Sequence, residues 1–184
     1  MTKQKSDLKF RLVVEQDGKD VHSEELGFMV LRKLELGNRW YSNVSNELIE
    51  LLVHHPDPAI SGYVAGNNQI SDASLELLAQ SQQKYIRNEL IDNDKFSDWA
   101  STELLLEYVR ADAEIAEKIA SRLGAFNSAN TNAVANVLLK HPSPAVRYNM
   151  ADDWSDIPKK LLRALQNDPD ASVRAMAAHK LKEK

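Results

Sequence analysis

The sequence predicts an all-α chain of about five stacked helix pairs, and three observations carry this prediction. One turn-plus-helix signature occurs twice, at 142–147 and again at 169–174, shifted by 27 positions. Weaker copies of the signature lie earlier in the chain. A leucine-rich helical pattern stands ahead of each copy. Periods of roughly 20–50 residues indicate units that cannot bury their apolar stripes alone and that share one elongated core when stacked.

The copies contain residues that begin helices. Ser143 and Asp170 can accept hydrogen bonds from the free N–H groups of a first helical turn. An earlier copy places Asp57 as the cap and Pro58 at the first helical position, where a missing N–H does no harm. Asp112 would cap a further copy, whereas the copy at 83–86 matches only in its apolar position.

Each copy supplies an apolar anchor and a second apolar residue four positions later. The anchors are Ile60, Ile86, Ile115, Val146 and Val173, and the second residues are Val64, Leu90, Ile119, Met150 and Ala177. A spacing of four places both residues on one helix face. The leucine-rich patterns ahead of the anchors occupy 48–52, 75–78, 104–106, 134–139 and 161–165. We therefore expect all five anchors in the core.

These copies resemble HEAT-like repeats, and residues 56–79, PDPAISGYVAGNNQISDASLELLA, are similar to the leucine-rich repeat variant. The resemblance covers residues from about 46 to 181. It departs at Ser61, where the pattern has Arg, and at Asp152 and Asp153, which replace its Asn region. The resemblance implies a right-handed α-α superhelix, a HEAT-like solenoid, over residues 43–184. Such patterns support an architecture better than a function.

Residues 1–42 do not fit the repeat and are predicted to form an N-terminal capping segment. Apolar residues alternate from Leu8 to Val14, and Asp17-Gly18 is a turn signal, which indicates a hairpin over 8–22. A helix is then expected from Ser23 to Gly37, with Leu26, Met29, Val30 and Leu34 on one face. Such a segment would cover the open end of the array.

Composition bounds the functional classes. A hydrophobic content of 43% argues against general disorder, and the lack of Cys removes disulfides and thiolate chemistry. No glycine-rich phosphate loop, HExxH or GxSxG motif occurs, so we expect no enzymatic activity, cofactor or metal. The four histidines near predicted helix ends suit helix C-termini better than metal ligation. Without a signal-peptide pattern or an apolar run of membrane-spanning length, we expect a cytoplasmic protein.

Charge is unevenly distributed around a net value of −4. Residues 89–117 contain nine acidic and two basic residues, whereas 159–184 contain seven basic and three acidic ones. A solvated surface explains this pattern most simply. The sharper interpretation is an acidic patch that faces a partner protein with a basic surface.

The arginines provide the candidate site. Arg87, Arg147 and Arg174 each follow an anchor directly, so stacking would align them along one ridge. The resemblance puts this ridge on or near the concave surface, which second helices line in HEAT-like arrays. The competing interpretation, favoured here, is an internal ladder that pairs each Arg with a carboxylate of the adjacent repeat, such as Asp152 or Asp170. The predicted partner-binding residues are Arg87, Arg147, Tyr148, Arg174, Asp152 and Trp154.

The three tryptophans and the segment 124–131 each allow two interpretations. Trp40, Trp99 and Trp154 each precede a leucine-rich helix, where an aromatic residue usually staples the chain to the core; ligand stacking by Trp154 is the alternative. Residues 124–131 are small and polar, which indicates either a tolerated insertion or a projecting functional loop.

Three functions fit these features. A non-catalytic protein-binding scaffold using the concave face is the primary hypothesis. The alternative is a DNA-binding protein related to HEAT-like alkylpurine DNA glycosylases, which would need a basic groove and Trp near a flipped base. The acidic balance argues against nucleic acid. A third resemblance, to HEAT-like bilin lyases, has no specific residue to support it.

Overall fold

The computed structural model describes residues 9–25, 45–55 and 57–183 of the 184-residue chain. These residues form a two-stranded hairpin and eleven α-helices, so the predicted mostly helical class is confirmed. The chain divides into two compact units, Met1–Asn93 and Asp94–Lys184, here called the N-terminal and C-terminal units. The boundary predicted at residue 42 lies outside the described residues. No helix in the described ranges is long and apolar enough to cross a membrane.

The hairpin consists of β1 (Arg11–Gln16) and β2 (Lys19–Glu25), paired antiparallel. Asp17 and Gly18 have φ values of 53° and 72°, and two positive φ values are the signature of a type I′ turn. The predicted hairpin is therefore confirmed. The alternation does not bury one face, however: Leu12, Val13 and Val14 are 44%, 48% and 44% exposed.

The prediction of a helix that begins at Ser23 is wrong for residues 23–25. Ser23 pairs with Val13 and lies in β2, which continues to Glu25. Strand pairing here overrides the capping signal of a serine, because cross-strand neighbours rather than local propensity decide such positions. The remainder of that predicted helix, from Leu26 to Gly37, and the Trp40-Tyr41 pair lie outside the described residues.

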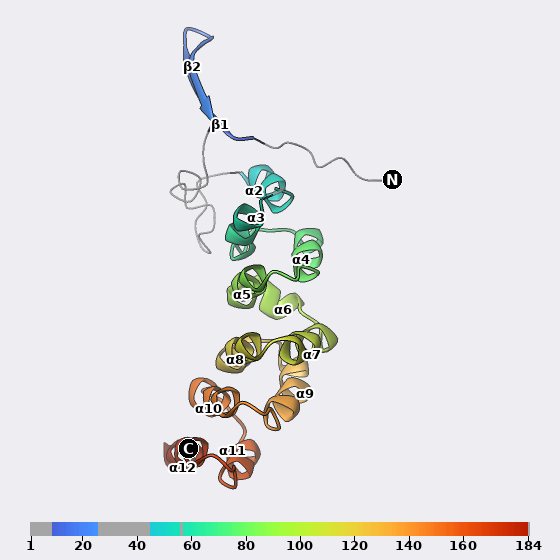
Figure 1. Ribbon diagram of the computed structural model, residues 1–184, viewed down its shortest axis with the longest axis vertical. Coiled ribbons are helices and arrows are strands. Elements are labelled where there is room, and N and C mark those ends of the chain that lie inside the picture. The colour runs from blue at the N-terminus through green and yellow to red at the C-terminus, as the bar shows by residue number, and fades with distance from the viewer. Residues whose placement is uncertain (1–8, 26–44, 56, 184) are drawn as a thin grey trace. The chain divides into compact units, whose positions relative to one another are not determined.

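The N-terminal unit contains α2 (Asn46–Val53), α3 (Pro58–Ala65), α4 (Asp72–Ala79) and α5 (Lys84–Asp92). The predicted cap forms at α3, where the side chain of Asp57 accepts from Ala59 N at 2.9 Å. The side chain of Ser45 caps α2 by accepting from Leu48 N at 3.3 Å. Gln83, before α5, makes no side-chain capping bond, as expected of the weak copy at 83–86. Helix α3 packs on α2 and on α5, and α4 packs on α5 (Figure 1).

A glutamate joins the two pairs of the N-terminal unit. Glu50 of α2 accepts hydrogen bonds from Ser71 N at 2.7 Å and Ser71 Oγ at 3.0 Å, and also from Ser74 Oγ. The carboxylate thus sits at the start of α4, where helix N–H groups favour an anion. Burial alone would raise the pKa of Glu50, but these hydrogen bonds outweigh it and lower the pKa.

The C-terminal unit contains three further helix pairs and one helix that the sequence did not predict, α6 (Asp94–Trp99). The pairs are α7 (Thr102–Ala111) with α8 (Ala113–Ser121), α9 (Ser128–Leu138) with α10 (Pro144–Asp153), and α11 (Lys159–Leu165) with α12 (Ala171–Glu183). The second helices pack in succession, α8 on α10 and α10 on α12, while α7 packs on α9 (Figure 1). Each second helix therefore contacts the next one directly.

The predicted core is confirmed within each unit. All five anchors are at most 6% exposed, and the five apolar residues four positions after them are fully buried. The first helices bury one side of their leucine patterns and leave the other in solvent, so that Leu51 and Leu77 are 54% and 42% exposed. A helix pair thus buries its apolar stripe against a neighbouring pair, as a shared core requires.

Residues 124–131 are partly helical, and Gly124, Ala125 and Asn127 within this segment are exposed. A short 3-10 helix spans Leu123–Ala125, α9 begins at Ser128, and Leu123 and Phe126 are buried. The hydroxyl of Thr131 donates to the carbonyls of Phe126 and Asn127 at 3.3 and 3.0 Å. The buried side chains of Phe126 and Thr131 argue against a loop that projects as a whole, and the tolerated insertion, the simpler expectation, stays a prediction.

We expect Val146→Asp to destabilise the C-terminal unit by about 3 kcal/mol or more, because it would bury an unpaired charge. Val146 has no exposed surface, whereas its neighbour Ala145 is exposed on the same helix. Ala145→Asp is therefore a matched control and should leave stability nearly unchanged. Thermal unfolding followed by circular dichroism measures both; equal unfolding curves for the two variants would contradict the core position of Val146.

Candidate functional site

The three predicted arginines share one local arrangement. Each guanidinium reaches back to the turn that precedes its own helix. Arg147 donates from Nη1 to the carbonyls of His141 and Pro142 at 2.5 and 3.2 Å. Arg174 donates from Nη1 to the carbonyls of Asp168 and Pro169 at 2.7 and 2.9 Å. Arg87 donates from Nε to Ser81 O at 2.8 Å. The arginines therefore close the turn within each helix pair.

Arg147 makes an additional contact that joins two pairs. Its Nε and Nη2 donate to Oδ2 and Oδ1 of Asp168 at 2.6 and 2.8 Å, and the two side chains are only 8% and 4% exposed. Asp168 belongs to the turn between α11 and α12, so the favoured ladder interpretation holds for Arg147. Its carboxylate partner is Asp168, however, and not Asp152 or Asp170.

The ion pair is bidentate, with two parallel N–H···O hydrogen bonds. This geometry suits the planar guanidinium and makes such pairs stronger than a pair with one hydrogen bond. The hydrogen bonds from Arg147 lower the pKa of Asp168 against the opposing effect of burial. Asp168 also accepts from Asp170 N at 2.9 Å, so the same carboxylate organises the start of α12. Asp170 in turn caps α12 by accepting from Val173 N at 3.2 Å.

Burial decides which predicted residues can meet a partner. Arg87 and Arg147 are 4% and 6% exposed and keep their guanidinium groups inside the protein. Trp154 is 6% exposed and packs on Gly124, where an added Cβ would come within 2.8 Å of the indole. This arrangement favours the stapling interpretation of Trp154. Arg174 is exposed, and Tyr148 is half-buried.

Asp152 lies one helical turn after Tyr148 on α10 and is also partly exposed. Its carboxylate accepts a salt bridge from Lys180 Nζ of α12 at 3.7 Å. Tyr148 and Asp152 thus share one outward side of α10. Of the predicted set, these two residues and Arg174 are the ones that reach solvent.

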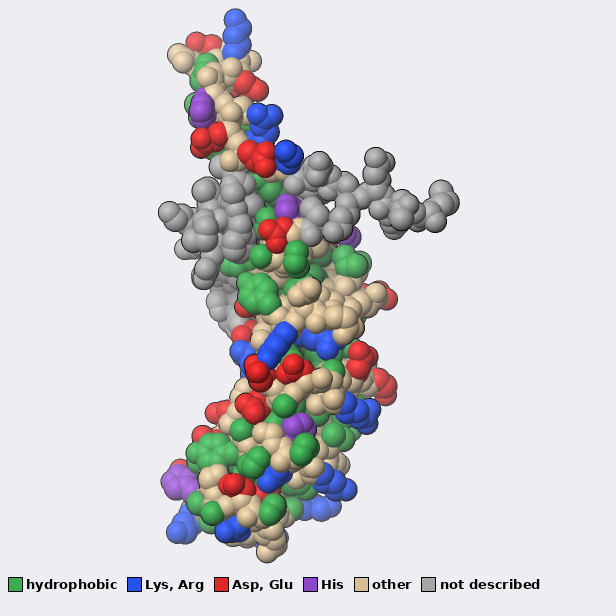
Figure 2. Space-filling view, viewed as in Figure 1, with side chains coloured by type: hydrophobic (Ala, Val, Ile, Leu, Met, Phe, Trp, Pro, Cys, Tyr) green, Lys and Arg blue, Asp and Glu red, His purple; other side chains and the backbone are tan. Residues whose placement is uncertain are grey.

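The outward side of α10 continues onto its two neighbours. Counting from each anchor, the second, third and sixth following residues are exposed or half-buried in α8, α10 and α12. We call these nine residues the second-helix face: Glu117, Lys118, Ser121, Tyr148, Asn149, Asp152, Ala175, Met176 and His179. Figure 2 shows acidic, basic and apolar side chains intermixed on the visible side of this unit. The sequence signal for this face is the anchor spacing, which also defines the core.

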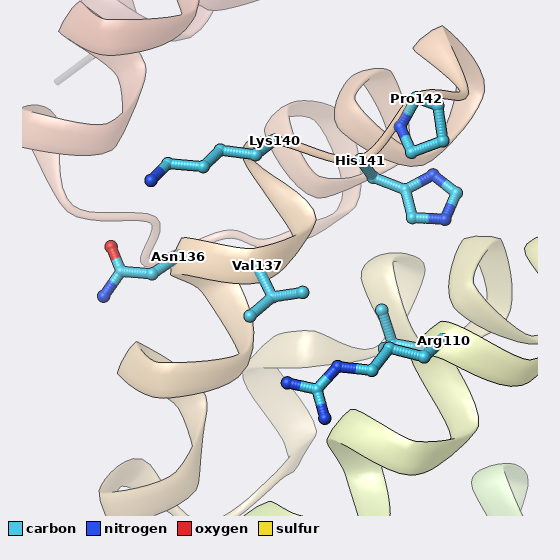
Figure 3. A pocket seen from close by; sticks show the side chains of 7 residues that line it. Arg110, Asn136, Val137, Lys140, His141 and Pro142 are labelled. Atoms are coloured by element: carbon cyan, nitrogen blue, oxygen red, sulfur yellow. The ribbon is translucent and has the colours of Figure 1, made fainter.

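A pocket that the sequence analysis missed lies between the C-terminal ends of α7 and α9. The α7–α9 pocket has a volume of about 540 Å³. Its lining residues are Val109, Arg110, Asn136, Val137, Lys140, His141 and Pro142. In Figure 3 the guanidinium of Arg110 extends toward α9, while Lys140 and Asn136 lie on one side of Val137 and His141 with Pro142 on the other. No motif marks this pocket, because its residues come from two helix ends about thirty positions apart.

A smaller cavity of about 250 Å³ is lined by Gly124, Phe126, Thr131, Asn132, Trp154 and Asp156. Within residues 9–25, 45–55 and 57–183, no group of three His, Asp or Glu side chains is placed to hold a metal ion. The histidines before two of the turns have a structural role: His55 and His141 accept through Nδ1 from the N–H two residues on, at 3.0 and 3.2 Å.

We expect Asp168→Asn to destabilise the C-terminal unit by about 3–5 kcal/mol at neutral pH, because it leaves the buried guanidinium of Arg147 without its counter-charge. Asp152→Asn, which alters a partly exposed pair, should cost about 1 kcal/mol or less. Denaturant unfolding of both variants checks this difference. Similar losses for the two would contradict the role given to the buried pair.

The same pair predicts a pH dependence. The folded-state pKa of Asp168 lies below its unfolded value of about 3.9. Above that pH the ionised carboxylate therefore makes its full contribution to the free energy of unfolding. Its contribution is lost as pH falls through the lowered folded-state pKa. Wild type should therefore lose more stability than Asp168→Asn on acidification, and unfolding curves at a series of acidic pH values measure this. Parallel losses would contradict the assignment.

No family model matches the chain, and neither a curated protein nor a solved structure matches it.

Proposed function

We propose that the helix pairs are HEAT-like repeats of an α-solenoid and that the chain is a non-catalytic module that binds another protein. Two features of the units support the solenoid: the anchors recur every 26 to 31 residues and are buried, and second helices pack on second helices within each unit. Arrays of this kind present broad surfaces built from equivalent positions of successive repeats.

The observation that carries the binding proposal is the second-helix face. Its nine residues come from three helices that pack in succession, so they form one continuous surface in the C-terminal unit. Tyr148 and Met176 supply the apolar contact area that protein interfaces favour. Charged side chains of both signs surround them, with Glu117 and Asp152 against Lys118. A mixed surface with a central aromatic residue suits a protein partner.

The DNA-binding alternative loses most of its supporting residues. It depended on Arg87, Arg147 and Arg174 for a basic groove and on Trp154 near a flipped base. Arg87, Arg147 and Trp154 are buried, so Arg174 is the one exposed residue of that set. Arg147 is neutralised by Asp168. The second-helix face carries more acidic than basic residues, which disfavours contact with a phosphate backbone. Exposed acidic residues on α7 and α8, namely Glu103, Glu107 and Glu114, keep the proposal of a partner with a basic surface.

The test removes the apolar centre of the face. We expect Tyr148→Asp with Met176→Asp to reduce capture of the native partner about tenfold or more, because truncating or charging a central aromatic costs about 2 kcal/mol or more. The partner is identified by affinity capture from the source cells with wild-type protein. Quantitative mass spectrometry then compares the variants.

The matched control introduces the same charges on the first helices. Ala133→Asp with Ala164→Asp changes two exposed alanines of α9 and α11, and it should capture the partner as wild type does. Circular dichroism confirms that both double variants are folded. Equal capture by the face variant and wild type would overturn the proposal for this face, and a captured nucleic acid would favour the alternative.

A further inference from the structure

The α7–α9 pocket presents hydrogen-bond donors around an apolar floor. Val109, Val137 and Pro142 form the floor, and Val109 is 2% exposed. Arg110 lies in the last turn of α7, and Lys140 follows the end of α9. The pocket is therefore built where two helices end, a place where free carbonyl groups would normally attract cations.

Four carbonyl groups at the α9 end of the pocket are already occupied. The carbonyls of His141 and Pro142 accept from Arg147, and those of Val137 and Leu138 accept from the N–H groups of Lys140 and His141 at 3.1 and 3.0 Å. The ion pair of Arg147 with Asp168 holds the guanidinium in this position. At this end the pocket therefore offers a ligand its side-chain donors, and these four backbone acceptors are not available.

His141 contributes a further donor. Its Nδ1 accepts from Ser143 N at 3.2 Å, so in the neutral ring the proton resides on Nε2. Burial, with the charge of Arg147, lowers the pKa of His141, which keeps the ring neutral at neutral pH. Among the described residues, no carboxylate pairs with Arg110 or Lys140. Two full positive charges and an N–H donor are thus available in one pocket.

We propose that the α7–α9 pocket binds a short acidic segment of another protein. An apolar side chain of that segment lies against Val109, Val137 and Pro142, and neighbouring Asp or Glu carboxylates pair with Arg110 and Lys140. Charge-assisted hydrogen bonds to carboxylates are among the strongest available to a surface site. This site shares no lining residue with the second-helix face, so it gives the module a second contact.

A peptide fits better than a nucleic acid because the positive charge is local. Glu103 and Glu107 are exposed on the same helix as Arg110. Glu117, which accepts from Ser143 Oγ at 3.3 Å, lies near His141. A polyphosphate chain would have to pass these carboxylates, whereas a few side-chain carboxylates can enter between them. The two cations also match the small number of charges that a short segment carries.

The competing explanation is that Arg110 and Lys140 stabilise helix C-termini and bind nothing. Binding and stability readouts separate the two. The probe is a library of random peptides of about a dozen residues displayed on phage, selected against wild-type protein. The test variant is Arg110→Glu with Lys140→Glu. Its control is Lys160→Glu with Arg163→Glu, which reverses the charge of one Lys and one Arg at exposed positions within α11.

We expect the enriched peptides to contain Asp or Glu next to a large apolar residue. A synthetic copy of an enriched peptide should bind the pocket variant at least about tenfold more weakly than wild type. The loss of one charge-assisted hydrogen bond reduces binding affinity by about that factor or more. Its affinity for the control variant should lie within about threefold of its affinity for wild type, because dissolved salt screens the charges of exposed residues outside the pocket. Melting temperatures measured alongside show that both variants are folded.

Several results would overturn the proposal. Enrichment of basic or neutral peptides would do so, as would an acidic peptide that binds wild type and pocket variant equally. Selection that yields no binder, with a stability loss in the pocket variant, would assign the cations to the helix ends. Salt-dependent retention of duplex DNA that the pocket variant loses would assign the site to phosphates. Each of these leaves the partner of the second-helix face unaffected, so the two proposals fail separately.

Discussion

The structure of the C-terminal unit depends on one buried guanidinium. Arg147 binds the carbonyls of its own turn and the carboxylate of Asp168 in the next helix pair, at distances of 2.5 to 3.2 Å. A buried charge is costly unless it is paired and its remaining donors are satisfied. Because the partners of Arg147 come from two successive pairs, the charge fixes their relative position, and the apolar anchors supply the burial that stabilises the unit.

Both candidate surfaces follow from this packing. The contact of α8 with α10 and of α10 with α12 brings equivalent positions side by side, which creates the second-helix face. On the first helices, Arg147 takes up the carbonyl groups of the turn after α9 and leaves Arg110 and Lys140 to face solvent. Arg147 itself is buried, so it offers a contact to neither surface.

The anchors and caps were predictable because they are local: helix starts need a capping oxygen, and spacing of four defines a face, as at Asp57 with Ile60 and Val64. The position of Arg147 was predictable, but its partner was not, since Asp168 lies 21 residues ahead and only packing selects it over Asp170. Ser143 stands at the predicted cap but its hydroxyl donates to Glu117 of the preceding pair instead. Helix α6, the ordered segment around Phe126 and the α7–α9 pocket depend on contacts between distant residues, which no local pattern encodes.

Native-state hydrogen exchange of wild type, Arg147→Ala and Arg174→Ala tests the coupling role of Arg147 most directly. The two arginines occupy equivalent positions, but Arg174 contacts only its own turn among the described residues, so it is the matched control. If Arg147 couples two pairs, Arg147→Ala should accelerate exchange in α10, α11 and α12 together, while Arg174→Ala should affect the start of α12 alone. Faster exchange confined to α10 in Arg147→Ala would contradict the coupling.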